Sequence, residues 1–210
     1  MIKISEVFSG IQGEGRYAGT PMTFIRVSGC TKACLFCDTK YHKLGKEYSI
    51  EEILKDIEKS GTRIICFTGG EPLLYMTDIA WIIRHCKDSN SSFLNNRIFH
   101  VETNGDLLVK DTFDWFDYLA ISPKAKETAD ACQSLIRGWD KQHSCDIKVV
   151  TDLRINADLI PYATILMPLT TPNQKLNKLT RQKVWKYCLE NNLRYSPRLH
   201  YEIFGKRRGI

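Results

Sequence analysis

Short apolar runs alternate with helix-patterned stretches along this 210-residue chain. Between the runs, Ser49 can cap a helix through Lys59 with Glu52 at the capping-box position, and similar patterns cover Asp78–Cys86, Thr128–Gly138 and Leu179–Asn191. Alternating strands and helices predict an α/β fold, here a partial or compressed parallel (β/α) barrel of about six strands. Strands buried on both faces are apolar at consecutive positions, as are Met22–Val27, Arg63–Phe67, Ile98–Val101, Tyr118–Ile121, Ile147–Val150 and Thr164–Met167.

The length of the chain fits one domain covering residues 1–210. We expect an N-terminal segment over residues 1–21, a barrel core over 22–168, and a C-terminal helix and tail over 169–210. The first residues lack the apolar stretch of a signal peptide, and no run approaches the roughly 18 apolar residues of a membrane span. We therefore expect a cytoplasmic protein without membrane contact, whose thiols stay reduced.

The net charge of +6 permits an acidic partner or an anionic substrate. The lysines and arginines are scattered, however, and the one dense run lies near the end of the sequence. A solvated basic surface accounts for this pattern, and no nucleic acid is required to explain it.

Polar residues follow the predicted strands at their carboxyl ends, where active sites of parallel α/β barrels lie. The first strand leads into Cys30, the second into Gly69-Gly70-Glu71-Pro72, the third into Glu102-Thr103-Asn104-Gly105 and the fourth into Ser122-Pro123-Lys124. We expect these residues to share one rim.

Three cysteines lie within eight residues of a predicted loop, spaced Cys30-x3-Cys34-x2-Cys37. Thiolates are the usual ligands of iron–sulfur clusters, and three of them leave one iron of a cubane open to S-adenosylmethionine. A zinc site is the alternative, with His42 as a candidate fourth ligand. The other cysteines are isolated and are predicted to be small buried hydrophobes: Cys66, Cys86, Cys132, Cys145 and Cys188.

The cysteine spacing and Gly69-Gly70-Glu71-Pro72 are similar to two motifs of the radical S-adenosylmethionine superfamily. With Gln12-Gly13-Glu14-Gly15 and Cys37-Asp38-Thr39, the sequence resembles the 7-carboxy-7-deazaguanine synthases of queuosine and 7-deazapurine biosynthesis over nearly its whole length. The resemblance implies a lyase with a [4Fe–4S] cluster, S-adenosylmethionine and Mg2+. It would contract the ring of 6-carboxy-5,6,7,8-tetrahydropterin and release ammonia.

The resemblance also implies roles for individual residues. Cys30, Cys34 and Cys37 would hold the cluster, and Thr39 would bind Mg2+. The expected cofactor contacts are Gly69, Gly70, Glu71, Glu102 and Ser122, and the expected substrate contacts are Gln12, Gly13, Glu14, Arg26 and His200. In chemical terms, a carboxylate such as Glu14 can accept from the donors of a pyrimidine edge. The Arg26 guanidinium can clamp a carboxylate as a fork.

Other interpretations remain open from sequence alone. A glycyl-radical enzyme activase shares the cysteine motif, and an iron–sulfur or zinc binding module would cleave no cofactor. Lys148 lies inside a predicted strand and is expected to pack its stem there with its ammonium at the rim. The resemblance further suggests a homodimer and an electron donor such as flavodoxin.

Overall fold

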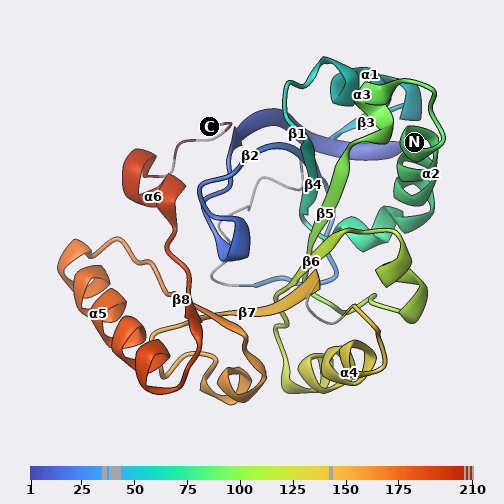
Figure 1. Ribbon diagram of the computed structural model, residues 1–210. Coiled ribbons are helices and arrows are strands. Elements are labelled where there is room, and N and C mark those ends of the chain that lie inside the picture. Colours follow the sequence, from blue (N-terminus) through green and yellow to red (C-terminus); the bar gives the residue numbers. More distant parts are fainter. Residues whose placement is uncertain (35–36, 38–43, 142–143, 206, 208, 210) are drawn as a thin grey trace.

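The computed structural model describes residues 1–34, 37, 44–141, 144–205, 207 and 209. Within these residues, nine strands form one curved sheet in the order β3-β1-β2-β4-β5-β6-β7-β8-β9 (Figure 1). The strands are β1 (Ile2–Ile11), β2 (Pro21–Val27), β3 (Lys46–Tyr48), β4 (Ile64–Gly69), β5 (Ile98–Thr103), β6 (Tyr118–Ile121), β7 (Cys145–Thr151), β8 (Ile165–Pro168) and β9 (Arg194–Tyr195).

Neighbouring strands from β2 to β9 are parallel, whereas β1 runs antiparallel to β2 and to β3. The six predicted strands are therefore confirmed, with ends that differ by at most two residues. The N-terminal strand β1 was not predicted. Its start alternates, since Ile2 and Ile4 are buried and Lys3 is exposed, which is the pattern of a strand with one solvated face.

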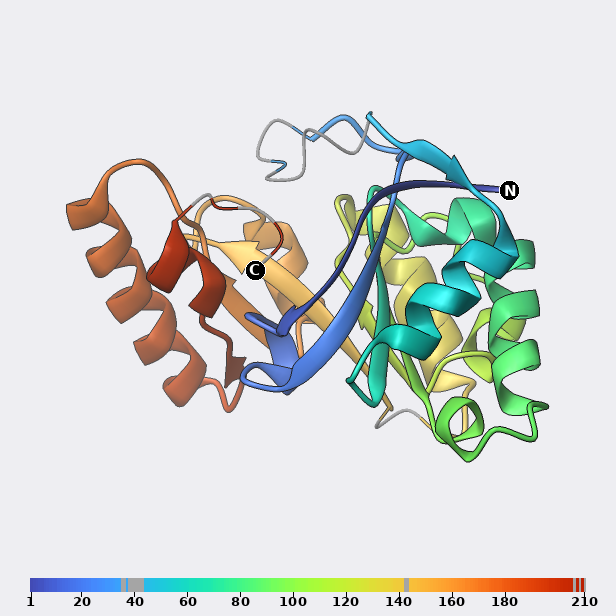
Figure 2. The same ribbon diagram turned by 90° about the horizontal axis from the view of Figure 1, so that it is seen from above.

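Helices α1–α5 lie on the outside of the curved sheet, whereas α6 lies at its open side (Figure 1), and Figure 2 shows α5 and α6 on one side of the molecule with α1–α4 on the other. Ser49 caps α1 as predicted, because its hydroxyl accepts from the Glu52 N–H while Glu52 accepts from the Ser49 N–H. No helix among the described residues is long and apolar enough to cross a membrane. The helices are α1 (Ile50–Lys59), α2 (Met76–Lys87), α3 (Ser92–Asn95), α4 (Lys126–Arg137), α5 (Gln174–Glu190) and α6 (Leu199–Phe204).

The two faces of the sheet bury different side chains. Toward the helices, Ile25, Phe67 and Phe99 belong to an apolar core that also contains Ile53 of α1 and Ile82 of α2. The opposite face, inside the arc, carries polar residues that are equally buried: His100, Asp146 and Lys148. Since buried polar groups cost free energy unless they are paired, the inside of the arc requires a network of hydrogen bonds.

Candidate active site

The segment between β1 and β2 folds into the arc of the sheet and forms a single 3-10 turn, η1 (Gly15–Tyr17) (Figure 1). Its ends are closed by hydrogen bonds between Gln12 and residues 19 and 20. The segment is also tied to the chain beyond β9, because the Gly15 N–H donates to Ser196 Oγ at 2.7 Å and the Leu199 N–H donates to the Gly13 carbonyl at 3.0 Å. A Cβ atom on Gly13 would lie 2.0 Å from His200 Nδ1, so a larger residue there would displace the His200 ring.

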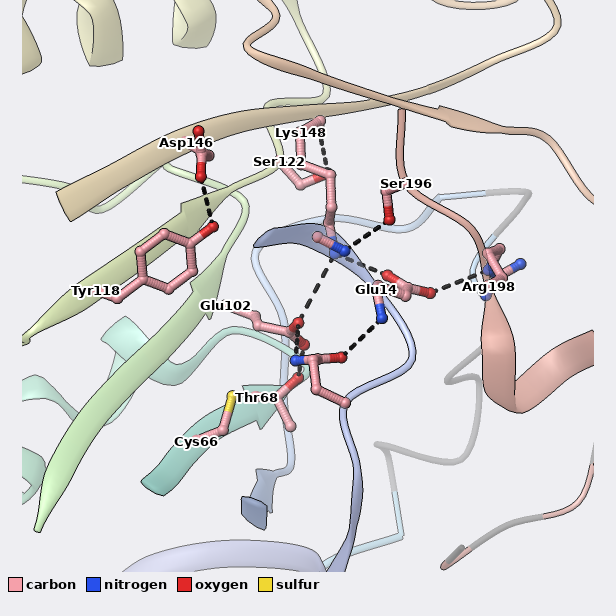
Figure 3. Close-up of polar contacts among 12 residues, drawn as sticks. Glu14, Cys66, Thr68, Glu102, Tyr118, Ser122, Asp146, Lys148, Ser196 and Arg198 are labelled. Carbon is pink, nitrogen blue, oxygen red and sulfur yellow. Dashed lines mark hydrogen bonds and ion pairs between the residues drawn. The ribbon is translucent and has the colours of Figure 1, made fainter. Parts of the chain in front are cut away.

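Glu14 occupies the centre of this arrangement (Figure 3). One carboxylate oxygen accepts from Lys148 Nζ at 2.7 Å, and the other accepts from Arg198 Nε at 3.0 Å. His200 Nε2 lies 3.9 Å from the second oxygen. Burial acts to raise the pKa of Glu14, but the charges of Lys148, Arg198 and His200 outweigh it and hold that pKa well below its ordinary value. Glu14 is therefore an anion at neutral pH.

The Lys148 ammonium lies inside the arc between two carboxylates, and its side chain is only 8% exposed. Nζ is 2.7 Å from Glu14 Oε2 and 3.7 Å from Glu102 Oε1. Burial would lower the pKa of Lys148, yet both carboxylates raise it above its ordinary value. The register explains the position: Ile147 and Val149 belong to the apolar face of β7, so the side chain between them points inward.

Gln12 and Glu102 extend the network toward β4. The Gln12 amide donates to Glu102 Oε1 at 3.2 Å, and its carbonyl oxygen accepts from the Glu14 N–H at 3.1 Å. The other Glu102 oxygen accepts from Thr68 Oγ1 at 2.7 Å. Gln12, Glu14 and Glu102 line a narrow pocket of about 10 Å³, roughly the space of one water molecule.

Below the pocket, toward the amino ends of the strands, a second buried network fixes η1. Asp146 accepts from Arg16 Nε at 2.7 Å and from the Tyr118 hydroxyl at 2.9 Å. The Tyr17 ring packs against His100 and Tyr118, with ring centroids 4.5 and 4.8 Å apart. Burial lowers the pKa of His100 to about 4, so this ring is neutral at physiological pH.

The predicted glycine turn after β4 packs against the residues that precede Cys30. A Cβ on Gly70 would lie 1.6 Å from the Gly29 carbonyl oxygen, and the Glu71 N–H donates to that same oxygen at 2.8 Å. The Glu71 carboxylate is fully buried and accepts from the Leu73 N–H, the Thr103 hydroxyl and the Asn104 N–H, at 3.1, 2.7 and 2.7 Å. The close approach of Gly70 to Gly29 and the hydrogen bonds of Glu71 thus join the turns after β2, β4 and β5.

Cys30, Cys34 and Cys37 are partly exposed, whereas the other five cysteines are buried, as predicted. The structure does not gather the three thiols: among the described residues, no three Cys, His, Asp or Glu side chains are grouped as a metal site. Their chemistry fits an iron–sulfur cluster, since three accessible thiols follow the carboxyl end of β2 beside a turn without side chains. Thr39 and His42 lie outside the described residues.

The remaining predicted residues lie around this rim. Arg26 pairs with Glu6 of β1, with Nε 3.2 Å from the carboxylate, and its Cγ lies next to Gly69. Ser122 donates to the Lys148 carbonyl at 3.0 Å and accepts from Lys124 Nζ at 2.9 Å. Gln12, Gly13, Glu14, Glu102 and His200 therefore meet in one place, while Arg26, Glu71 and the cysteines lie nearer β2 and β4.

Comparison with known proteins connects this arrangement to a family. The Radical SAM superfamily model matches residues 24–125. A 7-carboxy-7-deazaguanine synthase of Thermoplasma acidophilum is 31% identical over 218 residues, which cover 99% of both chains. This chain belongs to the 7-carboxy-7-deazaguanine synthase family. A family member from Hyperthermus butylicus is 29% identical, with 95% of this chain and 92% of the relative covered.

Solved structures agree with the fold. The crystal structure of QueE from Escherichia coli superposes with a TM-score of 0.55 at 18% identity and covers 95% of this chain and 94% of that one. Native anSMEcpe with bound AdoMet and Cp18Cys peptide also gives a TM-score of 0.55, at 17% identity, covering 86% of this chain and 65% of that one. The α/β prediction with a largely parallel sheet is confirmed.

Three residues of the two buried networks were absent from the predicted site: Lys148, Asp146 and Arg198. A charged residue inside an apolar strand was the available signal for the first two, because such a residue must be paired if it is buried. Arg198 follows a two-residue strand that has no sequence signature, and its approach to Glu14 depends on the closed fold.

Proposed function

We propose that this chain is a lyase that contracts the ring of 6-carboxy-5,6,7,8-tetrahydropterin to 7-carboxy-7-deazaguanine and releases ammonia. The observation that carries the proposal is the meeting of Gln12 and Glu14 inside the barrel of a member of the synthase family. The glycyl-radical activase and the binding module are not favoured, because the relatives that match the whole chain are synthases.

In this proposal Glu14 reads the pyrimidine edge of the pterin. A carboxylate has about four acceptor directions, and Lys148 and Arg198 use two of them. The remaining directions suit the N–H donors of an aminopyrimidinone. Gln12, fixed by Glu102 and by the Glu14 N–H, and His200, beside Gly13, would line the same edge. Arg26 would release Glu6 and bind the substrate carboxylate in its place.

The family implies a [4Fe–4S] cluster and S-adenosylmethionine, and we propose Cys30, Cys34 and Cys37 as the cluster ligands. When bound, the cluster and S-adenosylmethionine together supply the carbon radical that begins the reaction. Gly69, Gly70, Glu102 and Ser122 would line the cofactor side. Glu71 would act there largely through the turns that it ties together, since its carboxylate is buried and already accepts three hydrogen bonds.

Several finer assignments belong to the same proposal. Thr39 would offer its hydroxyl to Mg2+ together with substrate oxygens and water, since this ion rarely has an all-protein cage. An acidic one-electron donor such as flavodoxin would suit the basic chain. Two copies would form a homodimer, and the protein would work in the cytoplasm as a single-domain enzyme over residues 1–210.

The proposal is tested by the mass of the product. Anaerobically reconstituted protein, dithionite, S-adenosylmethionine, Mg2+ and the carboxy-tetrahydropterin should give 7-carboxy-7-deazaguanine. Glu14→Gln should lower kcat/KM roughly tenfold to a hundredfold, because a buried hydrogen-bond partner is lost, while iron content and slow cofactor cleavage without pterin remain. Cofactor cleavage without pterin conversion would favour the activase, and absence of cleavage would favour the binding module.

A further inference from the structure

The loop after β5 holds the beginning of the cysteine loop, although the two are more than 70 residues apart in sequence. The Asn104 amide donates to Thr31 Oγ1 at 2.9 Å. Asp106 accepts from the Thr31 hydroxyl at 2.9 Å and from Lys32 Nζ at 3.0 Å, and its other oxygen accepts from Thr128 at 3.0 Å. Residues 31 and 32 are therefore anchored by side chains of a different strand connection.

The Asn104 side chain has a fixed orientation within this contact. The residue is 7% exposed, its backbone N–H donates to the buried Glu71 carboxylate, and its Oδ1 accepts from the Asp106 N–H at 2.9 Å. With the oxygen used in this way, the NH2 group faces the cysteine loop. Nδ2 lies 3.7 Å from Cys30 Sγ, and the Lys32 N–H lies 3.4 Å from the same sulfur. Cys30 thus accepts from two N–H donors.

We propose that Asn104 is a positioning residue of the iron–sulfur site, and that its side-chain amide donates to the Cys30 sulfur and raises the reduction potential of the cluster. The inference rests on the proposed cluster ligation by Cys30. Reduction transfers one electron from an external donor to the cluster and adds negative charge that its sulfurs share, with no bond to the protein made or broken. An N–H donor stabilises the more negative state, and hydrogen bonds to sulfur are among the levers that set such potentials.

The test compares midpoint potentials of reconstituted clusters by EPR-monitored titration without pterin. Asn104→Ser keeps an oxygen for the Asp106 N–H but withdraws the donor from sulfur without adding charge. We expect its reduction equilibrium constant to fall about tenfold, a shift of about 59 mV for a one-electron couple. Thr31→Val is the matched control: it removes the two hydrogen bonds of the Thr31 hydroxyl but leaves the Asn104 amide beside Cys30, so its potential should equal that of the wild type.

A second measurement needs no substitution. In wild-type protein labelled with 15N only at asparagine side-chain amides, pulsed EPR of the reduced cluster should detect coupling to one nitrogen. Unchanged potential in Asn104→Ser with full iron content, an equal shift in Thr31→Val, or absence of the 15N coupling would each overturn the inference. If the wild-type protein binds no cluster, the proposed function is overturned as well. Normal pterin turnover with an unchanged potential would remove only the role of Asn104.

Discussion

At the residue scale, the inner network is a compensated set of buried charges. Glu14 and Glu102 face Lys148, and Glu14 also faces Arg198, so two anions are balanced by two cations. Burying such groups is costly unless each is paired and hydrogen-bonded. The network therefore stabilises the fold only while it is complete, and removal of one member should destabilise the protein more than removal of an exposed ion pair.

Lys148→Met tests this directly. The substitution leaves Glu14 buried with Arg198 as its remaining close cation, and breaking a buried ion pair typically costs about 3–5 kcal/mol. Because Arg198 persists, we expect a loss of about 3 kcal/mol in urea denaturation at pH 7. Lys186→Met removes an exposed pair with Glu190 on α5 and should change the unfolding free energy little. Similar losses in the two variants would contradict a buried network.

The ion pair between Glu14 and Lys148 also predicts that stability depends on pH. The pKa of Glu14 is lower in the folded protein than its ordinary value of 4.5. Its stabilisation is therefore fully present above that ordinary value and is lost as the pH falls through the lower, folded-state pKa. The stability difference between wild type and Lys148→Met should be constant from about pH 7 to 5.5 and should shrink below about pH 4.5. A difference that grows on acidification would show that another group is responsible.

At the scale of elements, the turns after β2 and β4 must approach each other through glycine backbones. Gly70→Ala would place Cβ against the Gly29 carbonyl oxygen, which belongs to backbone and has little freedom to move. We expect a loss of about 3 kcal/mol, as for an overpacked core, together with weaker iron retention because the displaced turn precedes Cys30. Gly61→Ala, with no atom within 4 Å of the added Cβ, should be neutral or slightly stabilising by thermal denaturation.

Elements were predictable from sequence where burial imposes a simple pattern. The run Tyr118–Ile121 is a strand buried at every position, and sequence and structure agree on its ends. By contrast, β9 has two residues and owes its existence to its neighbour β8. The α5 helix begins at Gln174 rather than Leu179, because the Asn173 side chain caps it by accepting from the Leu176 N–H. A short strand or a polar first helical turn shows little periodicity. The sequence therefore predicted the start of α5 too late and did not predict β9.

Residues of the candidate site could be proposed from sequence, but their geometry could not. Gln12, Glu14 and Glu102 lie together, although only Glu102 of these three was expected on the rim that follows the strands. The partners of Glu14 could not be read from sequence, because the separation between Glu14 and Arg198 is 184 residues and depends on how far the sheet curves. Glu71 was expected to face a ligand, and its three protein donors follow from the closeness of β4 and β5, which spacing alone does not reveal.

At the scale of the whole molecule, the segment at residues 12–17 joins the amino-terminal hairpin to the chain beyond β9. Ser196→Ala removes the acceptor of the Gly15 N–H, and an unpaired buried donor costs about 1–3 kcal/mol. We expect faster hydrogen exchange at residues 12–17 and 194–200 by mass spectrometry, with exchange in β4, β5 and β6 unchanged. Ser134→Ala, on the exposed side of α4, is the control and should leave residues 12–17 unaffected. Uniformly faster exchange in Ser196→Ala would indicate global destabilisation instead.

The joining of these distant segments also orders the assembly of the enzyme during synthesis. Residues 1–106 already include the cysteine loop, the glycine turns against which it packs and the Asn104–Asp106 anchor. Glu14 obtains its basic partners only when Lys148 and then Arg198 have been made. In a chain that folds from its amino end as it is translated, we expect the half with the proposed cluster ligands to be folded while Glu14 still faces water, so that cluster loading precedes completion of the pocket around Glu14.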